Sequence, residues 1–300
     1  MKTRALIYII LAGALWGTSG VFVHFLAPYG ITSVQMTAVR GTVSFLCLAG
    51  YALMKDRTLF RASRRELLLY ACMGAAIFAT ATLYYTAMQL TSVATAVVLM
   101  YTAPIYVMIF SVLFLGESLS RGKMASVALM LVGCCLVSGI IGGLKFDLIG
   151  ILLGVFTGLM YAVYNIVTKV AMKQGGRPVS ATTYSFLTMG AIAIPFCGPG
   201  ALVSAASQEP LVTVPLLIGL GIVTCVMPYF LYTLSMRHLS AGTATSLGIV
   251  EPMAATLYSV AFLKESIDVF QIIGIVLILL AVVFLSKEES LADTDARSDE

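Results

Sequence analysis

The sequence predicts an all-α polytopic membrane protein whose ten transmembrane helices form two inverted five-helix repeats around a central cavity. Three observations lead to this fold class: an apolar composition, ten apolar segments with short polar connections, and an internal similarity between the halves of the chain. Of the 300 residues, 60% are hydrophobic and 11% are charged, against about 25% charged residues in an average soluble domain. So few polar groups cannot cover a soluble protein of this length. The composition therefore excludes soluble enzymes, nucleic-acid binders and secreted disulfide scaffolds.

The apolar segments define the expected helices in chain order. Each is about 20 residues long, which is the length that crosses the hydrocarbon core of a bilayer. The first continues to Leu26 without a small-residue cleavage site, so we expect a retained span rather than a signal peptide. The ten expected spans are residues 6–26, 34–54, 67–87, 93–115, 122–141, 148–172, 181–199, 212–235, 242–263 and 267–286.

The distribution of Lys and Arg predicts the orientation. With a cytoplasmic N-terminus, fifteen of the 18 basic residues fall on the inside and two, Lys145 and Lys264, fall on the outside. The positive-inside rule therefore places both ends of the chain in the cytoplasm, and we expect a multi-pass protein of the bacterial inner membrane. Residues 287–300 are acidic and poor in aromatic residues, which predicts a disordered cytoplasmic tail.

The two halves of the chain resemble each other. An offset of 148 residues aligns the 47 residues 92–138 with 240–286 without a gap, and the identical pairs include Pro104 with Pro252 and Glu117 with Glu265. We therefore predict one repeat over residues 1–145 and another over 146–286. Because each holds five helices, an odd number, the second enters the membrane inverted. Inverted repeats are typical of secondary transporters, whose substrate sites lie between the halves at the bilayer midplane.

These residues resemble a known family, the EamA-type members of the drug/metabolite transporter superfamily. The resemblance covers residues 5–286. The residues that carry it are Trp16-Gly17, Arg40, Tyr84, Ala87 and Ala94, then Pro104 followed by Leu115-Gly116-Glu117, and Glu251-Pro252 followed by Leu263-Lys264-Glu265. By this resemblance the first four helices of each half would surround the cavity, and the fifth would be peripheral. Members of this family resemble exporters of amino acids and other metabolites, and some import.

Two charged residues inside spans are the first candidates for a site. Glu251 is the acid well inside a span, and its counterpart in the first half is Ala103. A carboxylate in the membrane is costly, which marks it as a functional hypothesis, for example as a proton-coupling group. The alternative is a structural acid bonded to a neighbouring helix. Arg40 either snorkels outward or faces inward as the partner of Glu251 or of a substrate carboxylate.

Polar and aromatic residues at depth complete the candidate site. We expect Trp16, Tyr101, Tyr161 and Asn165 to contribute to the wall of the cavity. Further candidates are His24, which pairs with Asn165 in the inverted arrangement, and Tyr84 and Tyr232, which pair at the offset of 148. For each tyrosine the alternative is helix packing, and for His24 it is a solvated position at the membrane interface.

Three prolines are expected to interrupt spans. Pro104, Pro228 and Pro252 lie in mid-span, where a proline removes one backbone hydrogen bond and frees a carbonyl. Such a break beside a cavity can bind polar cargo or allow bending. A plain kink that fits the helix bundle is the alternative.

The sequence therefore favours a secondary-active exporter of small metabolites that works by alternating access. A passive facilitator or an importer on the same fold is the alternative, and a membrane-embedded enzyme is less favoured because no catalytic motif is found. We expect no metal, because the six cysteines form no ligand motif, and no cofactor apart from coupling to the proton gradient. The expected partners are a small-molecule substrate and the lipid bilayer, without nucleic acid, and we expect a monomer.

Overall fold

The computed structural model describes residues 2–117, 119–139, 147–264 and 266–298, with the backbone alone at 93–94 and 289–298. Over these residues the chain is helical and contains no strand. Glu265, Lys145 and the expected boundary between the halves at 145/146 lie outside the described residues, as does the side chain of Ala94.

The helices follow the apolar segments, several of them in two or three pieces. The elements up to residue 139 are α1 (Lys2–Gly17), α2 (Ser19–Leu26), η1 (Ala27–Tyr29), α3 (Ser33–Lys55), η2 (Arg57–Phe60), α4 (Arg64–Leu90), α5 (Val93–Met100), α6 (Ala103–Phe110), η3 (Ser111–Leu115) and α7 (Arg121–Val137). The elements from residue 147 are α8 (Leu148–Lys173), α9 (Pro178–Ala193), η5 (Ile194–Phe196), α10 (Pro199–Ala206), α11 (Pro210–Gly221), η6 (Ile222–Val226), α12 (Met227–Ser235), α13 (Ala241–Leu247), α14 (Val250–Tyr258), η7 (Ser259–Leu263) and α15 (Val269–Ser298).

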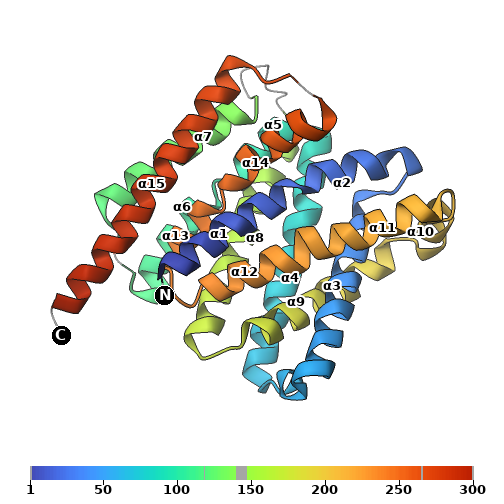
Figure 1. Cartoon of the computed structure of the whole chain (residues 1–300), viewed down its shortest axis with the longest axis horizontal. Helices are drawn as coiled ribbons and strands as arrows, with labels where there is room; N and C mark the ends of the chain where they lie inside the picture. Colours follow the sequence, from blue (N-terminus) through green and yellow to red (C-terminus); the bar gives the residue numbers. More distant parts are fainter. Residues whose placement is uncertain (1, 118, 140–146, 265, 299–300) are drawn as a thin grey trace.

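Nine helical stretches within the described residues are long and apolar enough to cross a membrane. A multi-pass membrane protein is therefore confirmed. The remaining expected span, residues 122–141, corresponds to α7, whose described helix has 17 residues. It lies alongside α15 at one edge of the molecule (Figure 1). The number ten and the inverted topology stay predictions.

Polar caps explain where the helices begin. The Thr32 and Ser63 side chains each accept a hydrogen bond from the third backbone N–H of the following helix, and Gln35 and Glu66 return the bond. These capping boxes satisfy donors that a helix start leaves free. Ser92 and Ser240, 148 residues apart, cap α5 and α13 in the same way.

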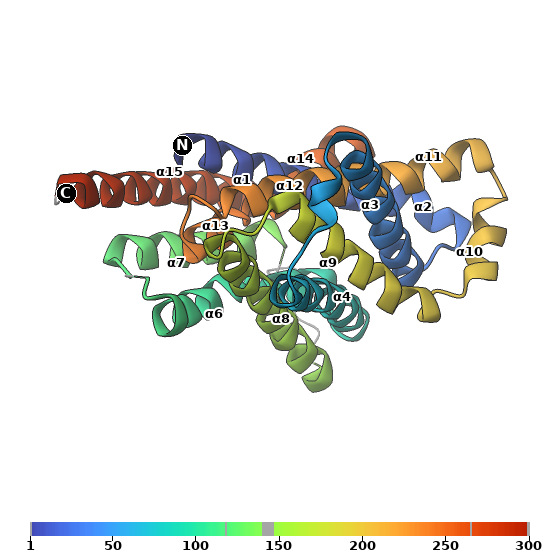
Figure 2. The same ribbon diagram turned by 90° about the horizontal axis from the view of Figure 1, so that it is seen from below.

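The extensive helix contacts join the two halves of the chain. α4 packs against α8 and α9, α3 packs against α9, and α1 packs against α12 and α14. In Figure 2 α1, α12 and α15 lie in one layer, with α4, α6 and α8 in another beneath it. The halves are therefore interleaved, so that a space between helices is lined by both of them.

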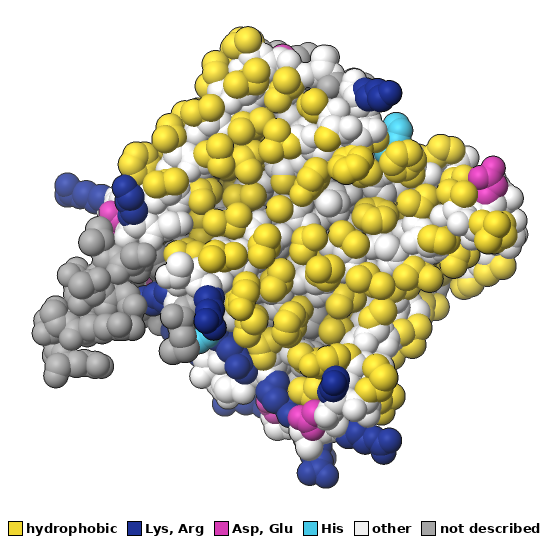
Figure 3. Space-filling view, in the orientation of Figure 1, with side chains coloured by type: hydrophobic (Ala, Val, Ile, Leu, Met, Phe, Trp, Pro, Cys, Tyr) yellow, Lys and Arg dark blue, Asp and Glu magenta, His cyan; other side chains and the backbone are white. Residues whose placement is uncertain are grey.

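Most of the Lys and Arg side chains visible in Figure 3 gather at one end of the molecule. Apolar side chains cover the broad middle of the face in Figure 3, and Lys and Arg side chains line its lower and lower-left edges. Both chain ends lie at this end (Figure 1). We call it the basic end; its segments are 55–64, 119–123, 173–177 and 236–241. The end with segments 27–32 and 198–210 is the opposite end.

The local structure repeats at the offset found in the sequence. The helix after Ser92 breaks at residues 101–102, and the helix after Ser240 breaks at residues 248–249. Each then continues for about two turns and ends in a five-residue π-helical turn, η3 and η7. Gly116 (φ 66°) and Lys264 (φ 57°) follow these turns in the left-handed conformation. The same backbone plan is thus built twice.

The chain after residue 286 differs from the expectation. Instead of a disordered tail, α15 continues to Ser298. The reason is local: Ala, Leu and Glu favour helix, and residues 287–292 contain four of them. The transmembrane helix also supplies the nucleus from which further turns extend.

Candidate functional site

A cavity of about 480 Å³ lies between helices of both halves. Arg40 and Glu251 are the charged residues of its wall, and the other lining side chains are aromatic, apolar or small and polar. The lining extends to Val23, Met88 and Ser266 toward the opposite end, and no segment of the basic end contributes to it. The cavity is therefore a pocket that reaches the opposite end and stops short of the basic end.

Glu251 stands at the break between α13 and α14. Its backbone N–H donates to Gly248 O at 3.0 Å, which begins the new helix. Its carboxylate accepts a hydrogen bond of 2.7 Å from the Tyr101 hydroxyl, and Tyr101 lies at the break between α5 and α6. The two interrupted helices therefore meet in the membrane interior through a phenol–carboxylate bond, which partly compensates the cost of burying an acid.

Arg40 enters the cavity from α3. Its Nε donates to Cys225 Sγ at 3.1 Å. Among the described residues, no ion pair within 4.0 Å joins Arg40 to Glu251. In this state the guanidinium is bonded to Cys225 and the carboxylate to Tyr101, so the pairing of Arg40 with Glu251 stays a prediction. Both face the same cavity, so a guanidinium and a carboxylate are offered to a molecule placed between them.

Trp16 forms an aromatic part of the wall. Its side chain is 4% exposed and packs edge-to-face on Tyr229 with ring centroids 5.1 Å apart. The indole N–H has no hydrogen-bond partner among the described residues. Gly17 lets α1 lie against α14, because a Cβ there would be 2.8 Å from Ala255 N. Trp16 is thus held beside the helix that carries Glu251.

The structure brings six of the nine expected site residues to the cavity and leaves three outside it. Trp16, Arg40, Tyr84, Tyr101, Tyr161 and Glu251 line it. Asn165 and Tyr232 do not, which corrects the expectation that Asn165 forms part of the wall. The Tyr232 hydroxyl donates to Asn165 Oδ1, and it lies 3.2 Å from Thr245 Oγ1. His24 is exposed beside Phe25, in agreement with an interfacial position.

The prolines lie just after interruptions of their spans. Pro104 is the second residue of α6, Pro252 the third of α14, and Pro228 the second of α12, directly after the π-helical turn η6. A proline in the first turn of a helix costs little, because the N–H it lacks would have no partner there. Pro252 also lines the cavity.

Several residues of the site carry no signal in the sequence. Cys225 is fully buried, belongs to no motif, and accepts the hydrogen bond of Arg40. Thr80, Tyr85 and Gln271 line the cavity without a motif. Nothing in their local pattern separates them from the other polar residues of the spans.

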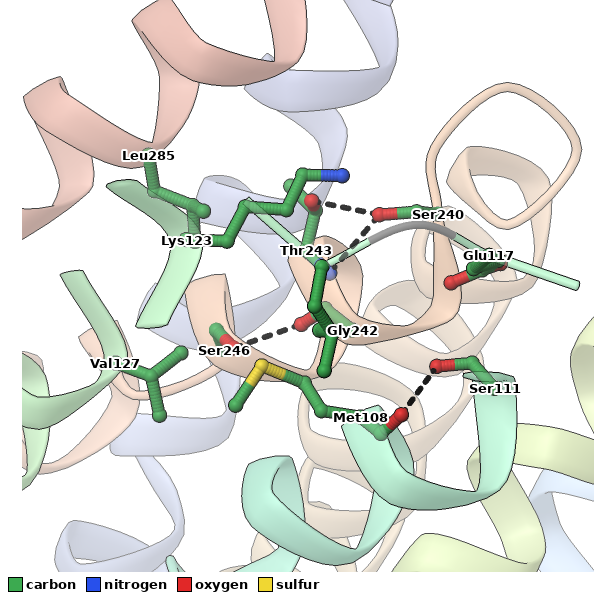
Figure 4. A pocket seen from close by; sticks show the side chains of 11 residues that line it. Met108, Ser111, Glu117, Lys123, Val127, Ser240, Gly242, Thr243, Ser246 and Leu285 are labelled. Carbon is green, nitrogen blue, oxygen red and sulfur yellow. Dashed lines mark hydrogen bonds between the residues drawn. The ribbon is translucent and has the colours of Figure 1, made fainter. Parts of the chain in front are cut away.

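A second hollow lies near the basic end, between α6, α7, α13 and α15 (Figure 4). Its volume of about 10 Å³ is about that of one water molecule. Its hydroxyl groups bond within their own helices, as Ser246 does to Gly242 O at 2.7 Å. Glu117 Oε1 accepts a bond of 3.1 Å from the N–H of Ala241. This hollow is a packing feature of the basic end and is too small for a metabolite.

Comparisons with known proteins agree with this architecture. A model of the EamA-like transporter family matches twice, over residues 3–139 and 148–287. An uncharacterized transporter of Archaeoglobus fulgidus is 29% identical over 93% of this chain and 95% of its own length. The uncharacterized transporter YwfM of Bacillus subtilis is 27% identical over 93% of each.

More distant proteins share the same length and fold. The uncharacterized inner membrane transporter YicL of Salmonella typhimurium is 22% identical over 95% of this chain and 96% of its own length. A solved crystal structure superimposes with a TM-score of 0.80 at 17% identity and covers 97% of this chain and 99% of its own. That likeness concerns the fold alone.

Proposed function

The chain belongs to the EamA-like transporter family, and on that premise we propose that it is a secondary-active transporter that exports small zwitterionic metabolites, amino acids or related compounds. The observation that carries the proposal is the cavity with one carboxylate and one guanidinium on its wall. No covalent chemistry is required. The protein would alternate between states open to either side of the membrane.

The charges of the cavity support the substrate class. A ligand with one cationic and one anionic group would satisfy Glu251 and Arg40 together, whereas an ion of either sign would leave one charge without a partner. Aromatic rings of Trp16, Tyr161 and Tyr229 would pack on the apolar part of the ligand. The volume of about 480 Å³ falls in the range of small-molecule sites.

The shape of the cavity supports an outward-open state. We propose that the basic end faces the cytoplasm, as the positive-inside rule requires. The cavity reaches the opposite end, while the basic end is closed by packed side chains and hydrogen bonds. In the inward-open state this pattern would be reversed.

The repeat supports the mechanism. We count α7 as a further crossing beside the nine long apolar helices. Both chain ends lie at the same end of the molecule, and this requires an even number of crossings. The second half would then be inverted relative to the first. Two copies of one unit in opposite orientations can form two related states of similar energy, one open to each side.

The test is transport by purified protein in proteoliposomes. Radiolabelled L-leucine and L-phenylalanine would be offered with uracil, which is uncharged, for comparison. We expect accumulation of the zwitterions against their gradient. Arg40→Ala should lower transport by about a hundredfold, since it removes a charge-assisted contact of about 3 kcal/mol. His24→Gln, outside the cavity, should change it less than about twofold.

The same vesicles separate the alternatives. Equilibration without accumulation would indicate a passive facilitator, and uptake in the opposite direction an importer. We propose that Glu251 couples transport to the proton gradient. A Glu251→Gln variant that kept the full dependence on that gradient would remove the coupling role while leaving transport intact. Absence of movement for every compound offered, with the fold intact, would contradict the proposed substrate class.

A further inference from the structure

A buried lysine stands between the cavity and the basic end. Lys169, one turn before the end of α8, is 7% exposed. Its ammonium group donates to Met236 O at 2.9 Å and to Leu239 O. Both carbonyls belong to the turn that follows α12, where helical carbonyls lack partners within the helix. A cation at this position is favourable, because it lies at the negative end of the helix dipole.

The turn after α12 returns the contact. Arg237, in that same turn, donates through Nη2 to Gly176 O at 2.8 Å. Gly176 belongs to the turn after α8. The end of α8 and the turn after α12 therefore each send one cation to backbone carbonyls of the other. We call these contacts of Lys169 and Arg237 the clasp.

A layer of buried polar contacts separates the clasp from the cavity. Asn165 lies one helical turn before Lys169 on α8 and accepts from the Tyr232 hydroxyl of α12. Tyr232 in turn lies 3.2 Å from Thr245 Oγ1 of α13. All three side chains are at most 1% exposed. α8 and α12 are thus joined twice in succession along the route from the cavity to the basic end, first by the bond between Tyr232 and Asn165 and then by the clasp.

We propose that the clasp is the inner gate of the transporter: it holds the basic end shut while the cavity is open at the opposite end, and it must release before the cavity opens to the basic end. The inference rests on the proposed function. An ammonium group in a dry interior keeps its charge at acceptable cost if it has carbonyl partners or water. Release of the clasp is therefore favourable only as water enters from the basic end. This gives the gate two stable arrangements, closed and dry or open and hydrated.

The test measures distances at both ends of the molecule and needs no substrate. Nitroxide pairs would be placed at Gln174 and His238 across the clasp, and at Gln89 and Ser266 across the mouth at the opposite end. All variants would be made in a protein whose six native cysteines are replaced. Position 225 would carry serine, so that Arg40 keeps a hydrogen-bond acceptor. Double electron–electron resonance in nanodiscs would compare the parent with Lys169→Met and Arg237→Gln. Lys173→Met is the matched control, since this exposed lysine of the same helix donates to Leu115 O at 3.2 Å.

We expect the clasp variants to lengthen the basic-end distance and to shorten the mouth distance, with the ratio of the two states shifting by about tenfold or more. The control should leave both distributions as in the parent. A change confined to the basic end, or no change at all, would show that these residues only fasten two turns together, and would overturn the proposal. Arg237 is exposed, so its variant answers the question if Lys169→Met does not fold. Because the distances are independent of transport, a failed gate and a failed transport assay are told apart.

Discussion

The two interrupted helices of this protein share a backbone plan and differ in chemistry. Both begin at a serine cap, break once, continue past a proline and end in a π-helical turn followed by a left-handed residue. At equivalent positions, however, the first carries Tyr101 and Ala103 where the second carries Ile249 and Glu251. The first break thus supplies the phenol and the second the acid. Duplication provides the frame of such a site, and divergence at a few positions makes the two halves complementary.

The largest effect should come from giving the first break the acid of the second. Ala103 is fully buried and does not line the cavity. Ala103→Glu would bury a carboxylate without a partner, and we expect a loss of about 3–5 kcal/mol of stability. Thermal unfolding of the purified protein measures it. Ala81→Glu, on the cavity wall, should cost clearly less; an equal cost would contradict the difference in environment.

The second test concerns the glycines behind the two breaks. Gly17 of α1 lies against α14, and Gly158 of α8 lies against the first break, where a Cβ would be 2.7 Å from Thr102 Oγ1. We expect Gly17→Ala and Gly158→Ala each to cost about 1–3 kcal/mol, since the helices must move apart. Gly20→Ala is the control, because a Cβ there has no neighbour within 4 Å among the described residues.

If Gly17→Ala and Gly158→Ala were both as stable as Gly20→Ala, each half would not depend on close contact with the first helix of the other. The measurement is again the thermal unfolding midpoint.

The third test removes the bond between the two breaks. Tyr101→Phe deletes the hydroxyl that donates to Glu251 and should lower the transport rate by about tenfold, as expected for one charge-assisted hydrogen bond of about 1.5 kcal/mol. Tyr85→Phe, a change of the same kind on the cavity wall, should alter the rate less than about twofold. Equal rates for both variants would argue that the phenol does not position the acid.

The smallest effect concerns the residues after the two π-helical turns. Gly116 adopts a left-handed conformation without strain, but its counterpart Lys264 adopts it with a side chain. Lys264→Gly should therefore raise stability by about 1 kcal/mol, and Gly116→Ala should lower it by a similar amount. Thermal unfolding reports both, and a destabilised Lys264→Gly would mean that the lysine side chain makes contacts worth more than the strain.

Local content was sufficient to predict the class and the nine spans found among the described residues. A bilayer leaves the backbone no hydrogen-bond partners except those within its own helix, so the length and polarity of each segment determine whether it spans. The offset of 148 residues also pairs Pro104 with Pro252, and the structure breaks the two helices just before these prolines, at residues 101–102 and 248–249. The helical continuation of α15 beyond residue 286 was missed, because an acidic composition was given more weight than helix propensity.

The site depended on tertiary structure. Sequence reasoning selected Glu251, Arg40 and Tyr101, but it did not predict that Tyr101 would bind Glu251 or that Cys225 would hold Arg40. It placed Asn165 on the wall of the cavity and gave Lys169 no role beyond the count of basic residues on the inside, although both are buried in α8. The physical reason is that a transmembrane helix is apolar toward lipid and toward its neighbours alike. Hydropathy therefore determines that a segment spans the membrane, whereas its rotation about its own axis, and so the partner of each polar side chain, is decided by packing against the other helices.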